Sequence, residues 1–586
     1  MTTKTIRLRF HRRLRKSQRQ VKKFGSKTGQ DVEKHLIRRL NRLLNVRRFI
    51  ISWLGLIILL TGIVAVQINL LSNYYQTLQP VRGGTYTEGV LGDFTTANPI
   101  YATSPVDTAV CHLVFSSLLT YNNQNQLVGD LASRWSVDTT GRIYTVHLKP
   151  HLVWQDGQPL TSSDVVFTYD LIQNPNAASP LSGNWQDVQV SAEGSLTVIF
   201  TLANPLTSFP YSLTNGIIPR HLLANIPAET LSTAAFNINP VGSGPFEWEN
   251  LNVEGNTPQT KQEQITLLPF ARYNSGEPKL SGFIVRAFHD QGQLVSSFQA
   301  GQLDGMSGLN SVLAVLAKDK QLQTYSMPLT AANMVFFNTS TAILSDTAVR
   351  QALVQAADVN AIINGLGYPV IPVREPLLNG QLAFNPTFEQ LPMNTLAAAQ
   401  ELQSNGWLLG SNGLRYKAGQ VLRFKLYADN DPESRYVTGM LAKEWRTIGV
   451  EAEVIIQDNT DLQNTVTFRE YDALLYGISI GVDPDVYVYW GSNQQTVNFS
   501  EYSSAVVDQS LEAGRTRYDP ALRVIKYEPF LQAWQQDAPA LGLYQPRYLY
   551  LTRESVYGLT EHTINEATDR FNNVQNWEIL RAKVDD

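Results

Sequence analysis

The chain has 586 residues, 43% of them hydrophobic and 10% aromatic, and its formal net charge is −4. This length supplies two or more domains and this composition supplies apolar cores, which excludes an intrinsically disordered protein. A single cysteine, Cys111, excludes an intrachain disulfide, so core packing has to stabilise the fold.

Residues 1–48 form a basic arm that holds 17 Lys and Arg against only Asp31 and Glu33, so the rest of the chain is acidic. Within this arm, Glu33–Leu44 places apolar side chains on one helical stripe and arginines on the opposite face. The stripe indicates a helix lying on an anionic membrane leaflet, or else a set of charges that only fixes topology. A nucleic-acid partner is not expected, because the arm has no zinc spacing and no evident folded recognition module.

Phe49–Leu71 is a stretch of 23 residues without a charged side chain. A helix of this length reaches roughly 35 Å and would cross a hydrocarbon core of about 30 Å. The alternative is a cleavable signal peptide, but a 48-residue lead is long for one, and no small-x-small cleavage site follows. Cys111 is also poorly placed for a lipoprotein anchor. We therefore predict an uncleaved transmembrane helix.

Positive charges lie mainly before this stretch. Arg47 and Arg48 immediately precede it, and the next positive charge after it is Arg82. The positive-inside rule then places the N-terminus in the cytoplasm and residues 72–586 outside the cytoplasm.

After a linker at residues 72–82, the pattern from Gly83 onward indicates a mixed α/β body. Ile143–Leu148 alternates as a half-buried strand, and the dipeptide Asp156-Gly157 marks a turn. Thr161 and Asp164 have the spacing of a capping box and predict that a helix begins there.

The second half of the chain shows the same alternation of helices and strands. The predicted elements, in chain order, are a helix capped by Ser345-Asp346, a helix at Leu396–Leu402 that ends at Asn405-Gly406, a helix carrying Val437 to Ile448, and strands at Val450–Ile456 and Tyr471–Gly477. The last strand runs into the loop ISIGVDPDVY. Because ligands bind beyond the carboxyl ends of strands in open α/β sheets, this loop is the first place to seek a site.

Seven segments, taken in order, resemble the bacterial extracellular solute-binding proteins of family 5, which include the oligopeptide-, dipeptide- and nickel-binding proteins of ABC importers. The resemblance extends from about Gly83 to Leu559, and its longest block is LVGDLASRWSVDTTGRIYTVHLKPHLVWQDGQPLTSSDVVFTYDLI. The segments lie at 82–99, 127–172, 240–248, 337–363, 441–454, 482–490 and 537–551.

This resemblance implies an α/β, two-lobed fold of the periplasmic-binding-protein kind (type II, large peptide-binding class). Lobe I would comprise residues 83–328 and 545–586, and lobe II residues 329–544, with crossovers near Met327–Met334 and Leu543–Arg547. It also implies a monomer without a cofactor that captures short peptides by lobe closure. The implied partners are that peptide, ABC permease subunits with their ATPases, and membrane lipid around residues 49–71 and, as one option, around the basic arm.

The resemblance also directs attention to residues for a peptide's ends. Asp483, with Asp485 as the alternate, is the candidate for the ligand ammonium, although Asp-Pro-Asp is equally suited to a simple turn. Arg435, in the loop expected before the Val437 helix, and Arg374 are candidates for the carboxylate. Further candidates are Tyr487 and Trp490 as pocket aromatics, and Asn333, Phe94 and Thr96 in the segments Ala331–Phe336 and Phe94–Ala97, which would add the ligand as a strand.

An enzyme is not expected, because no nucleophile elbow, H-E-x-x-H or phosphate-loop motif occurs and Cys111-His112 are merely neighbours in sequence. Six histidines beyond the predicted span do not cluster, and His147 lies on a predicted strand. Binding of nickel or of an oligosaccharide, and a peptide-sensing receptor that does not transport, remain alternatives within the same fold.

Overall fold

The computed structural model describes residues 47–255, 261–309, 311–313, 315–318, 322–494 and 496–585. The amphipathic segment expected at Glu33–Leu44 therefore lies outside the described residues. The chain divides into two units, one of the described residues up to 79 together with those from Arg581 onward, and one of residues 80–580.

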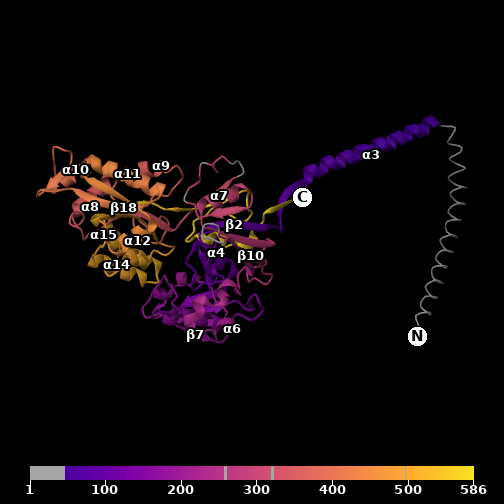
Figure 1. Ribbon diagram of the computed structural model, residues 1–586, viewed down its shortest axis with the longest axis horizontal. Helices are drawn as coiled ribbons and strands as arrows, with labels where there is room; N and C mark the ends of the chain where they lie inside the picture. Colours follow the sequence, from indigo (N-terminus) through magenta and orange to yellow (C-terminus); the bar gives the residue numbers. More distant parts are fainter. Residues whose placement is uncertain are drawn as a thin grey trace. The chain divides into compact units, whose positions relative to one another are not determined.

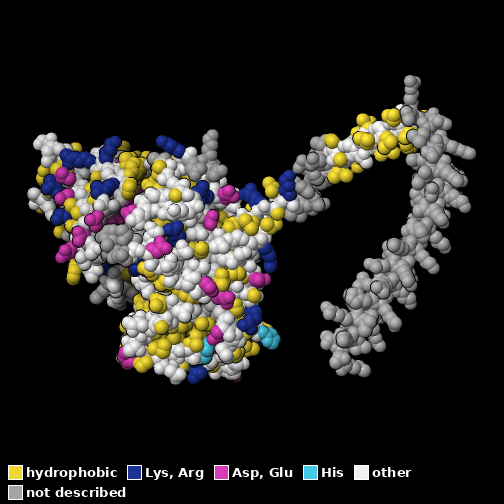
Figure 2. All heavy atoms as spheres, turned by 45° about the vertical axis from the view of Figure 1, so that its right-hand side comes forward, with side chains coloured by type: hydrophobic (Ala, Val, Ile, Leu, Met, Phe, Trp, Pro, Cys, Tyr) yellow, Lys and Arg dark blue, Asp and Glu magenta, His cyan; other side chains and the backbone are white. Residues whose placement is uncertain are grey.

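The first unit contains the apolar helix. Helix α3 (Arg47–Tyr75) is 29 residues long, and Figure 1 shows it as one continuous helix. Its segment Phe49–Ile68 is long and apolar enough to cross a membrane and is not buried by protein, and Figure 2 shows its hydrophobic surface. The hydroxyl of Thr61 donates to the carbonyl of Ile57 at 2.6 Å, which satisfies this group inside the helix. Its length and composition fit either a membrane span or a signal sequence.

The segment expected as a linker, residues 72–82, contains regular secondary structure. Helix α3 continues to Tyr75, and β1 (Gln76–Val81) pairs with β23 (Leu580–Asp585) in a two-stranded sheet. The pairing partner lies at the far end of the chain, so a local reading of the sequence could not reveal this strand.

The second unit contains two large sheets, and we call the part around each of them a lobe. The sheet of lobe I has seven strands, which lie side by side in the order β13 (Gln323–Pro328), β22 (Arg547–Thr552), β12 (Gly305–Ser307), β2 (Thr85–Leu91), β11 (Gly282–Phe288), β10 (Gln262–Pro269) and β9 (Phe246–Glu254). Strand β2 is parallel to both of its neighbours, whereas the remaining pairs are antiparallel.

Lobe I also contains smaller sheets and several helices. The sheets consist of β3 (Leu119–Tyr121) with β4 (Leu127–Gly129), and of β5 (Ala132–Val137), β6 (Ile143–Leu148), β8 (Thr197–Thr201) and β7 (Gln189–Glu193). The α-helices are α4 (Pro105–Val114), α5 (Ser162–Gln173), α6 (Arg220–Leu223) and α7 (Gln291–Gln299). Short 3₁₀ helices are η3 (Pro175–Ala177), η4 (Ser182–Trp185), η5 (Phe209–Thr214), η6 (Ala228–Thr233), η7 (Ala235–Ile238), η9 (Ala567–Phe571) and η10 (Val574–Asn576).

The sheet of lobe II has five strands, in the order β19 (Glu451–Gln457), β18 (Arg423–Asp429), β20 (Ala473–Ser479), β14 (Ala331–Phe337) and β21 (Ala540–Tyr544). A separate three-stranded sheet consists of β15 (Leu408–Leu409), β16 (Arg415–Lys417) and β17 (Gln420–Val421). The helices are α8 (Thr347–Ala356), α9 (Val359–Gly365), η8 (Pro386–Phe388), α10 (Thr395–Ser404), α11 (Pro432–Thr447), α12 (Asn459–Thr467), α13 (Tyr487–Trp490), α14 (Ala505–Arg515) and α15 (Pro520–Asp537), several of which Figure 1 shows around β18.

Strand β14 shows how the lobe II sheet is buried on both faces. Val335 and Phe337 belong to one buried cluster, with α8 and α11, whereas Met334 and Phe336 belong to a second cluster, with α14 and α15. Successive side chains of a strand point to opposite faces, so a strand with large apolar side chains on both faces has to be covered on both sides.

The chain passes between the two sheets twice. Strand β13 ends at Pro328 and β14 begins at Ala331, and β21 ends at Tyr544 and β22 begins at Arg547. Each crossover is thus only two residues long, which suits a hinge, because few residues absorb the change when lobes move.

Several local predictions are confirmed. Strand β6 has the predicted bounds. Helix α5 begins directly after its N-cap residue Thr161, which forms the predicted capping box with Asp164. Asp346 caps α8 by accepting from the amide of Ala348, and Gly449, with φ of 86°, ends the α11 region before β19. Strand β20 begins and ends two residues later than predicted. Ile478 and Ser479 therefore belong to the strand rather than to the following loop.

Candidate functional site

The two lobes touch through a loop of lobe I and the segment of lobe II that follows β20. The amide and hydroxyl of Thr207 both donate to the carbonyl of Arg515 at 2.9 Å. The Ser208 hydroxyl donates to Asp485 Oδ2 at 2.8 Å, and the Tyr518 hydroxyl bonds to that of Tyr144 at 3.0 Å. These four hydrogen bonds hold the lobes together on one side of a cavity.

This interlobe cavity has a volume of about 410 Å³. Lobe I supplies its wall from the β3–β4 turn with the start of β4, from β5, and from η5 with the loop before it. Lobe II supplies it from the chain between α9 and η8, the loop after β20 and the start of α15. The lining residues are Asn125, Gln126, Leu127, Trp135, Thr207, Pro210 and Tyr211 of lobe I, and Leu382, Val482, Asp483, Tyr518, Pro520 and Arg523 of lobe II. Aromatic rings and a few placed polar groups are the usual lining of a small-ligand site.

Asp483 lies in the wall of the interlobe cavity, where it forms an ion pair with Arg523. Both carboxylate oxygens accept from the guanidinium, at 2.8 Å and 2.7 Å, and the two side chains are 9% and 7% exposed. Burial is the largest single influence on Arg523 and lowers its pKa, but Asp483 and Tyr527 together raise it above the ordinary value, so the guanidinium stays charged. The carboxylate thus already has a cation beside it.

Asp485 lies where the lobes meet. Its Oδ2 accepts from Arg515 at 3.0 Å and from Ser208 of the other lobe, while its Oδ1 is buried without a hydrogen bond to the described residues. The guanidinium of Arg515 also lies over the ring of Tyr487, 4.7 Å from its centre. Asp485 and Tyr487 therefore belong to one cluster, and this cluster joins the lobes.

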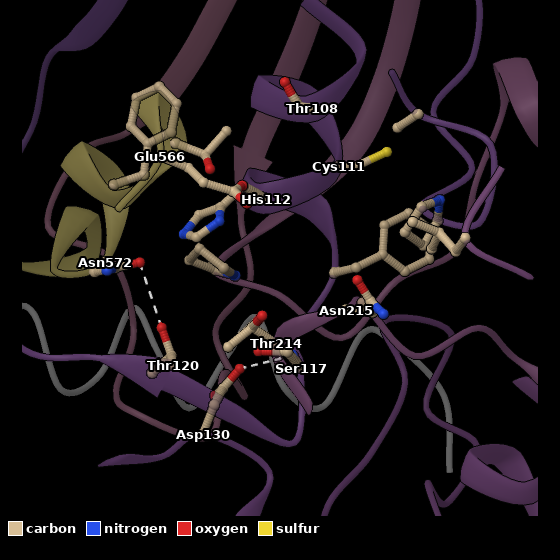
Figure 3. A pocket seen from close by; sticks show the side chains of 18 of the residues that line it. Thr108, Cys111, His112, Ser117, Thr120, Asp130, Thr214, Asn215, Glu566 and Asn572 are labelled. Atoms are coloured by element: carbon tan, nitrogen blue, oxygen red, sulfur yellow. Dashed lines mark hydrogen bonds between the residues drawn. The ribbon is translucent and has the colours of Figure 1, made fainter. Parts of the chain in front are cut away.

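A second cavity, of about 390 Å³, lies in lobe I alone (Figure 3). Its walls come from α4, the chain before β3, Asn215 in the loop after η5, and η9 with Glu566. At the bottom of this view Asp130 Oδ2 accepts from the amide of Ser117 at 2.9 Å, and Thr120 donates to Asn572 at 3.3 Å. Most of the polar groups that it presents are hydroxyls, amides and carboxyls.

A pair of stacked rings connects the surroundings of the lobe I cavity with the lining of the interlobe cavity. Tyr121, next to Thr120, stacks on Tyr211 with ring centres 6.5 Å apart. Burial raises the pKa of Tyr121, and Asp569, Tyr211, Glu566 and Asp483 raise it further, which places this ring near carboxylates of both cavities.

A third cavity, of about 300 Å³, lies at the second crossover; lobe II supplies most of its wall, including Asn333, and Pro546 and Arg547 complete it. Glu433 accepts there from the hydroxyls of Tyr368 at 2.5 Å and Tyr544 at 2.7 Å. The guanidinium of Arg547 lies 3.5 Å from the centre of the Tyr368 ring. This arrangement ties the crossover to lobe II.

The basic candidates lie elsewhere. Arg435 is in the first turn of α11 rather than in a loop, because Asp431 caps the helix by accepting from two amides and Pro432 begins it. Its guanidinium bonds to Asn430 at 2.5 Å and 3.0 Å. Arg374 bonds to Asn360 and lies 3.7 Å from Glu389. None of the cavities described above is lined by either arginine.

The structure contradicts ligand addition as a strand on Ala331–Phe336. Strand β14 pairs with β20 on one side and β21 on the other, so neither of its edges is free. In Phe94–Ala97 all four amides donate within the protein, to Glu263, twice to Asp107 and to Asn237. Phe94 and Thr96 are buried at 5% and 7% exposure, so this segment presents packed side chains.

Trp490 is fully buried in lobe II, where it packs against Phe336 and edge-on against Trp534. It lines none of the three cavities. The indole ring of Trp490 is therefore part of the hydrophobic core of lobe II.

Sequence reasoning missed Arg523, Arg515, Tyr121 and Glu566. Arg523 and Arg515 lie 40 and 30 positions from their carboxylate partners, and their helices place them only after the fold is formed. Aromatic residues make up 10% of the chain, and this composition does not distinguish a cavity wall from core.

Comparisons with known proteins agree with this architecture. The chain is 24% identical over 518 residues to the oligopeptide-binding protein AppA of Bacillus subtilis (strain 168), covering 86% of this chain and 93% of the relative. Among solved structures, the ABC transporter substrate-binding protein CtaP from Listeria monocytogenes matches with a TM-score of 0.74 at 25% identity, over 85% of this chain and 99% of that one. NikZ from Campylobacter jejuni, solved in complex with Ni(L-His), matches with a TM-score of 0.70 at 25% identity, over 84% and 99%.

The family model of the bacterial extracellular solute-binding proteins, family 5 Middle, matches residues 126–500, which is more than half of the chain. The two-lobed, mixed α/β fold of type II periplasmic binding proteins, predicted from the ordered segments, is confirmed. This chain belongs to the bacterial extracellular solute-binding proteins of family 5.

Proposed function

We propose that this protein captures a short peptide between its two lobes and delivers it to an ABC importer. The observation that carries this proposal is the interlobe cavity, which is walled by both lobes and bounded by hydrogen bonds that only a closed arrangement can form. A ligand favours closure when it makes better contacts in the closed state than in the open one.

The lining of the interlobe cavity suits a peptide. Trp135, Tyr211 and Tyr518 offer apolar faces with polar tips, and the Asp483–Arg523 pair offers adjacent negative and positive charge. A buried zwitterion needs both of its charged ends satisfied. We propose that the pair as a unit, rather than Asp483 alone, faces the ligand's polar groups.

The relatives support a peptide over other solutes, because AppA is named an oligopeptide-binding protein. The likeness to NikZ, solved with Ni(L-His), makes a nickel chelate the second candidate. We further propose that lobe I comprises residues 83–328 and 545–586 and lobe II residues 329–544, on either side of the two short crossovers.

Helix α3 is proposed as an uncleaved anchor, with the basic N-terminus in the cytoplasm and the solute-binding body outside. The 17 Lys and Arg before the apolar stretch and its length support this arrangement. In this account an ABC permease reads lobe closure as occupancy. Extraction of membranes at alkaline pH should leave the full chain in the pellet and release a variant that lacks residues 1–71; release of the full chain would contradict the anchor.

Native mass spectrometry of the purified full chain in detergent tests the ligand class, followed by thermal unfolding with di- to hexapeptides, Ni(L-His) and oligosaccharides. Stabilisation follows occupancy of the folded state, and 100-fold excess over Kd is worth about 2.7 kcal/mol. A co-purified peptide or a shift with peptides supports the proposal. A shift with only Ni(L-His) or only a sugar would replace the peptide by that solute. Loss of peptide uptake on deletion of the gene would support a role in import rather than in sensing alone.

A further inference from the structure

The lobe I cavity has an electrostatic character that the interlobe cavity lacks. Its lining includes two carboxyl groups, Asp130 and Glu566, and none of its lining residues, all of which are described, is Lys or Arg. Within the described part of the chain, neither carboxylate forms a salt bridge, although Lys149, which bonds to Asn274 beside Asp130, lowers the pKa of Asp130 against the effect of burial. In Figure 3 Glu566 and His112 lie on one side of the cavity, and Asp130 and Ser117 lie on another.

The imidazole that lines the cavity does not offset these carboxylates. Burial is the largest influence on His112 and lowers its pKa, so the ring is neutral at neutral pH. The guanidinium of Arg570 stacks on Phe571 of the cavity wall, 3.8 Å from the ring centre, but its charge is matched by Glu88 at 2.6 Å.

The two carboxyls differ in their freedom to meet a ligand. Asp130 is buried and accepts from Ser117 and, at 2.9 Å, from Asn274, so its oxygens are already hydrogen-bonded. Glu566 remains accessible to water and caps η9, although burial among its neighbours and then Asp569 raise its pKa. A cation beside such a carboxyl would favour the ionised form.

The lobe I cavity is also within reach of a ligand in the interlobe cavity. The Tyr121–Tyr211 stack separates the two, and Asn565, adjacent to Glu566, donates to Asn125 in the interlobe cavity at 2.6 Å. A ligand in the interlobe cavity is therefore one layer of side chains, the Tyr121–Tyr211 stack, away from the lobe I cavity that Glu566 lines.

We propose that the lobe I cavity receives a cationic side chain of the ligand, an ammonium or guanidinium group, and rejects a carboxylate. This inference rests on the proposed function and adds a charge preference to it. The hydroxyls and amides of Thr108, Asn215 and Thr568 would accept the remaining donors of the cation.

Isothermal titration of the full chain in detergent with trilysine, triglutamine and triglutamate tests the preference, because these probes place the same charge at every position. We expect trilysine to bind at least tenfold more tightly than triglutamate. Glu566→Gln should cut the trilysine advantage over triglutamine about tenfold while leaving the Kd of triglutamine within twofold. The glutamine amide oxygen can still cap η9, so the variant should fold.

Glu554→Gln, which changes an exposed carboxylate of lobe I outside the cavity, is the matched control and should leave the ratio unchanged. Peptides that bind without a charge preference, or a preference that Glu566→Gln does not reduce, would overturn the inference and leave the proposed function standing. Absence of binding by all three peptides and by the di- to hexapeptides would overturn both.

Discussion

Asp483 has a different environment in the structure from the one that its sequence context suggests. As part of Asp-Pro-Asp after a buried strand it suggests a free carboxylate for an ammonium, yet in the fold both of its oxygens meet Arg523. The pair is almost fully buried, and a buried ion pair that loses one member leaves an uncompensated charge. The pair therefore matters to stability as well as to the cavity.

Arg523→Met should destabilise the protein by about 3–5 kcal/mol, because it leaves Asp483 charged and buried. The double variant Asp483→Asn with Arg523→Met should recover part of this loss. The measurement is the free energy of unfolding from a urea titration. An Arg523→Met variant within 1 kcal/mol of the parent would show that the pair is not held as described.

Glu375 gives a prediction for pH dependence. It is fully buried, its Oε1 accepts from the amide of Asn385 at 3.1 Å, and its Oε2 has no hydrogen bond to the described residues. Burial raises its pKa to about 8. The folded state therefore binds a proton that the unfolded state releases between its ordinary pKa and about 8, so folding stability falls as pH rises through this range.

Glu375→Gln should remove this slope, which is on the order of 1.4 kcal/mol per pH unit for one proton. The check is urea unfolding of parent and variant at several pH values from 4.5 to 8. Glu453→Gln, at an exposed position of lobe II, should keep the parent's slope. Parallel curves for the parent and Glu375→Gln would contradict a buried titrating carboxyl.

At the scale of elements, the loop before η5 is the part of lobe I that holds lobe II. Ser208 donates to Asp485, and Thr207 donates twice to the Arg515 carbonyl, so the closed arrangement has contacts that do not depend on ligand. Such contacts raise the fraction of binding-competent protein, and apparent affinity scales with this fraction.

Ser208→Ala should therefore weaken peptide binding about tenfold, since a hydrogen bond to a charged group contributes about 1.5–3 kcal/mol. Calorimetry measures the Kd, and X-ray scattering should show a larger radius of gyration for the ligand-free variant. Ser163→Ala, which alters a hydroxyl that bonds within lobe I to Thr161, serves as control. An unchanged Kd in Ser208→Ala would show that the hydrogen bond from Ser208 to Asp485 does not contribute to lobe closure.

Elements with strong local signals were predictable from sequence. The capping box of α5 and the cap of α8 depend on residues within one turn, and both occur. The start of α11 was missed because the apolar periodicity begins only at Val437, although Asp431-Pro432 carried a cap and an N1 proline. Whether β14 has a free edge depends on the order of strands in the sheet, and the pairing of β1 depends on β23 at the other end of the chain.

For the whole molecule, family membership and the two-lobed fold were recognisable from the order of the seven segments, since these carry the fold's shared turns and caps. The cavity walls were not, because they combine residues such as Tyr121, Tyr211 and Arg523 that meet only when the lobes form. Two short crossovers between two well-packed sheets make a rigid-body hinge the natural motion of this body.

Closure of the two lobes around a peptide can be measured by pulsed electron–electron double resonance between a spin label on each lobe. Labels at Ser163→Cys in lobe I and Leu396→Cys in lobe II occupy exposed positions, in a background in which the buried Cys111 is replaced by Ala. We expect a saturating peptide to shorten and narrow the distribution of distances between the labels, and Ser208→Ala to broaden it in the ligand-free protein. A distribution that does not change when a peptide is bound would contradict capture by lobe closure.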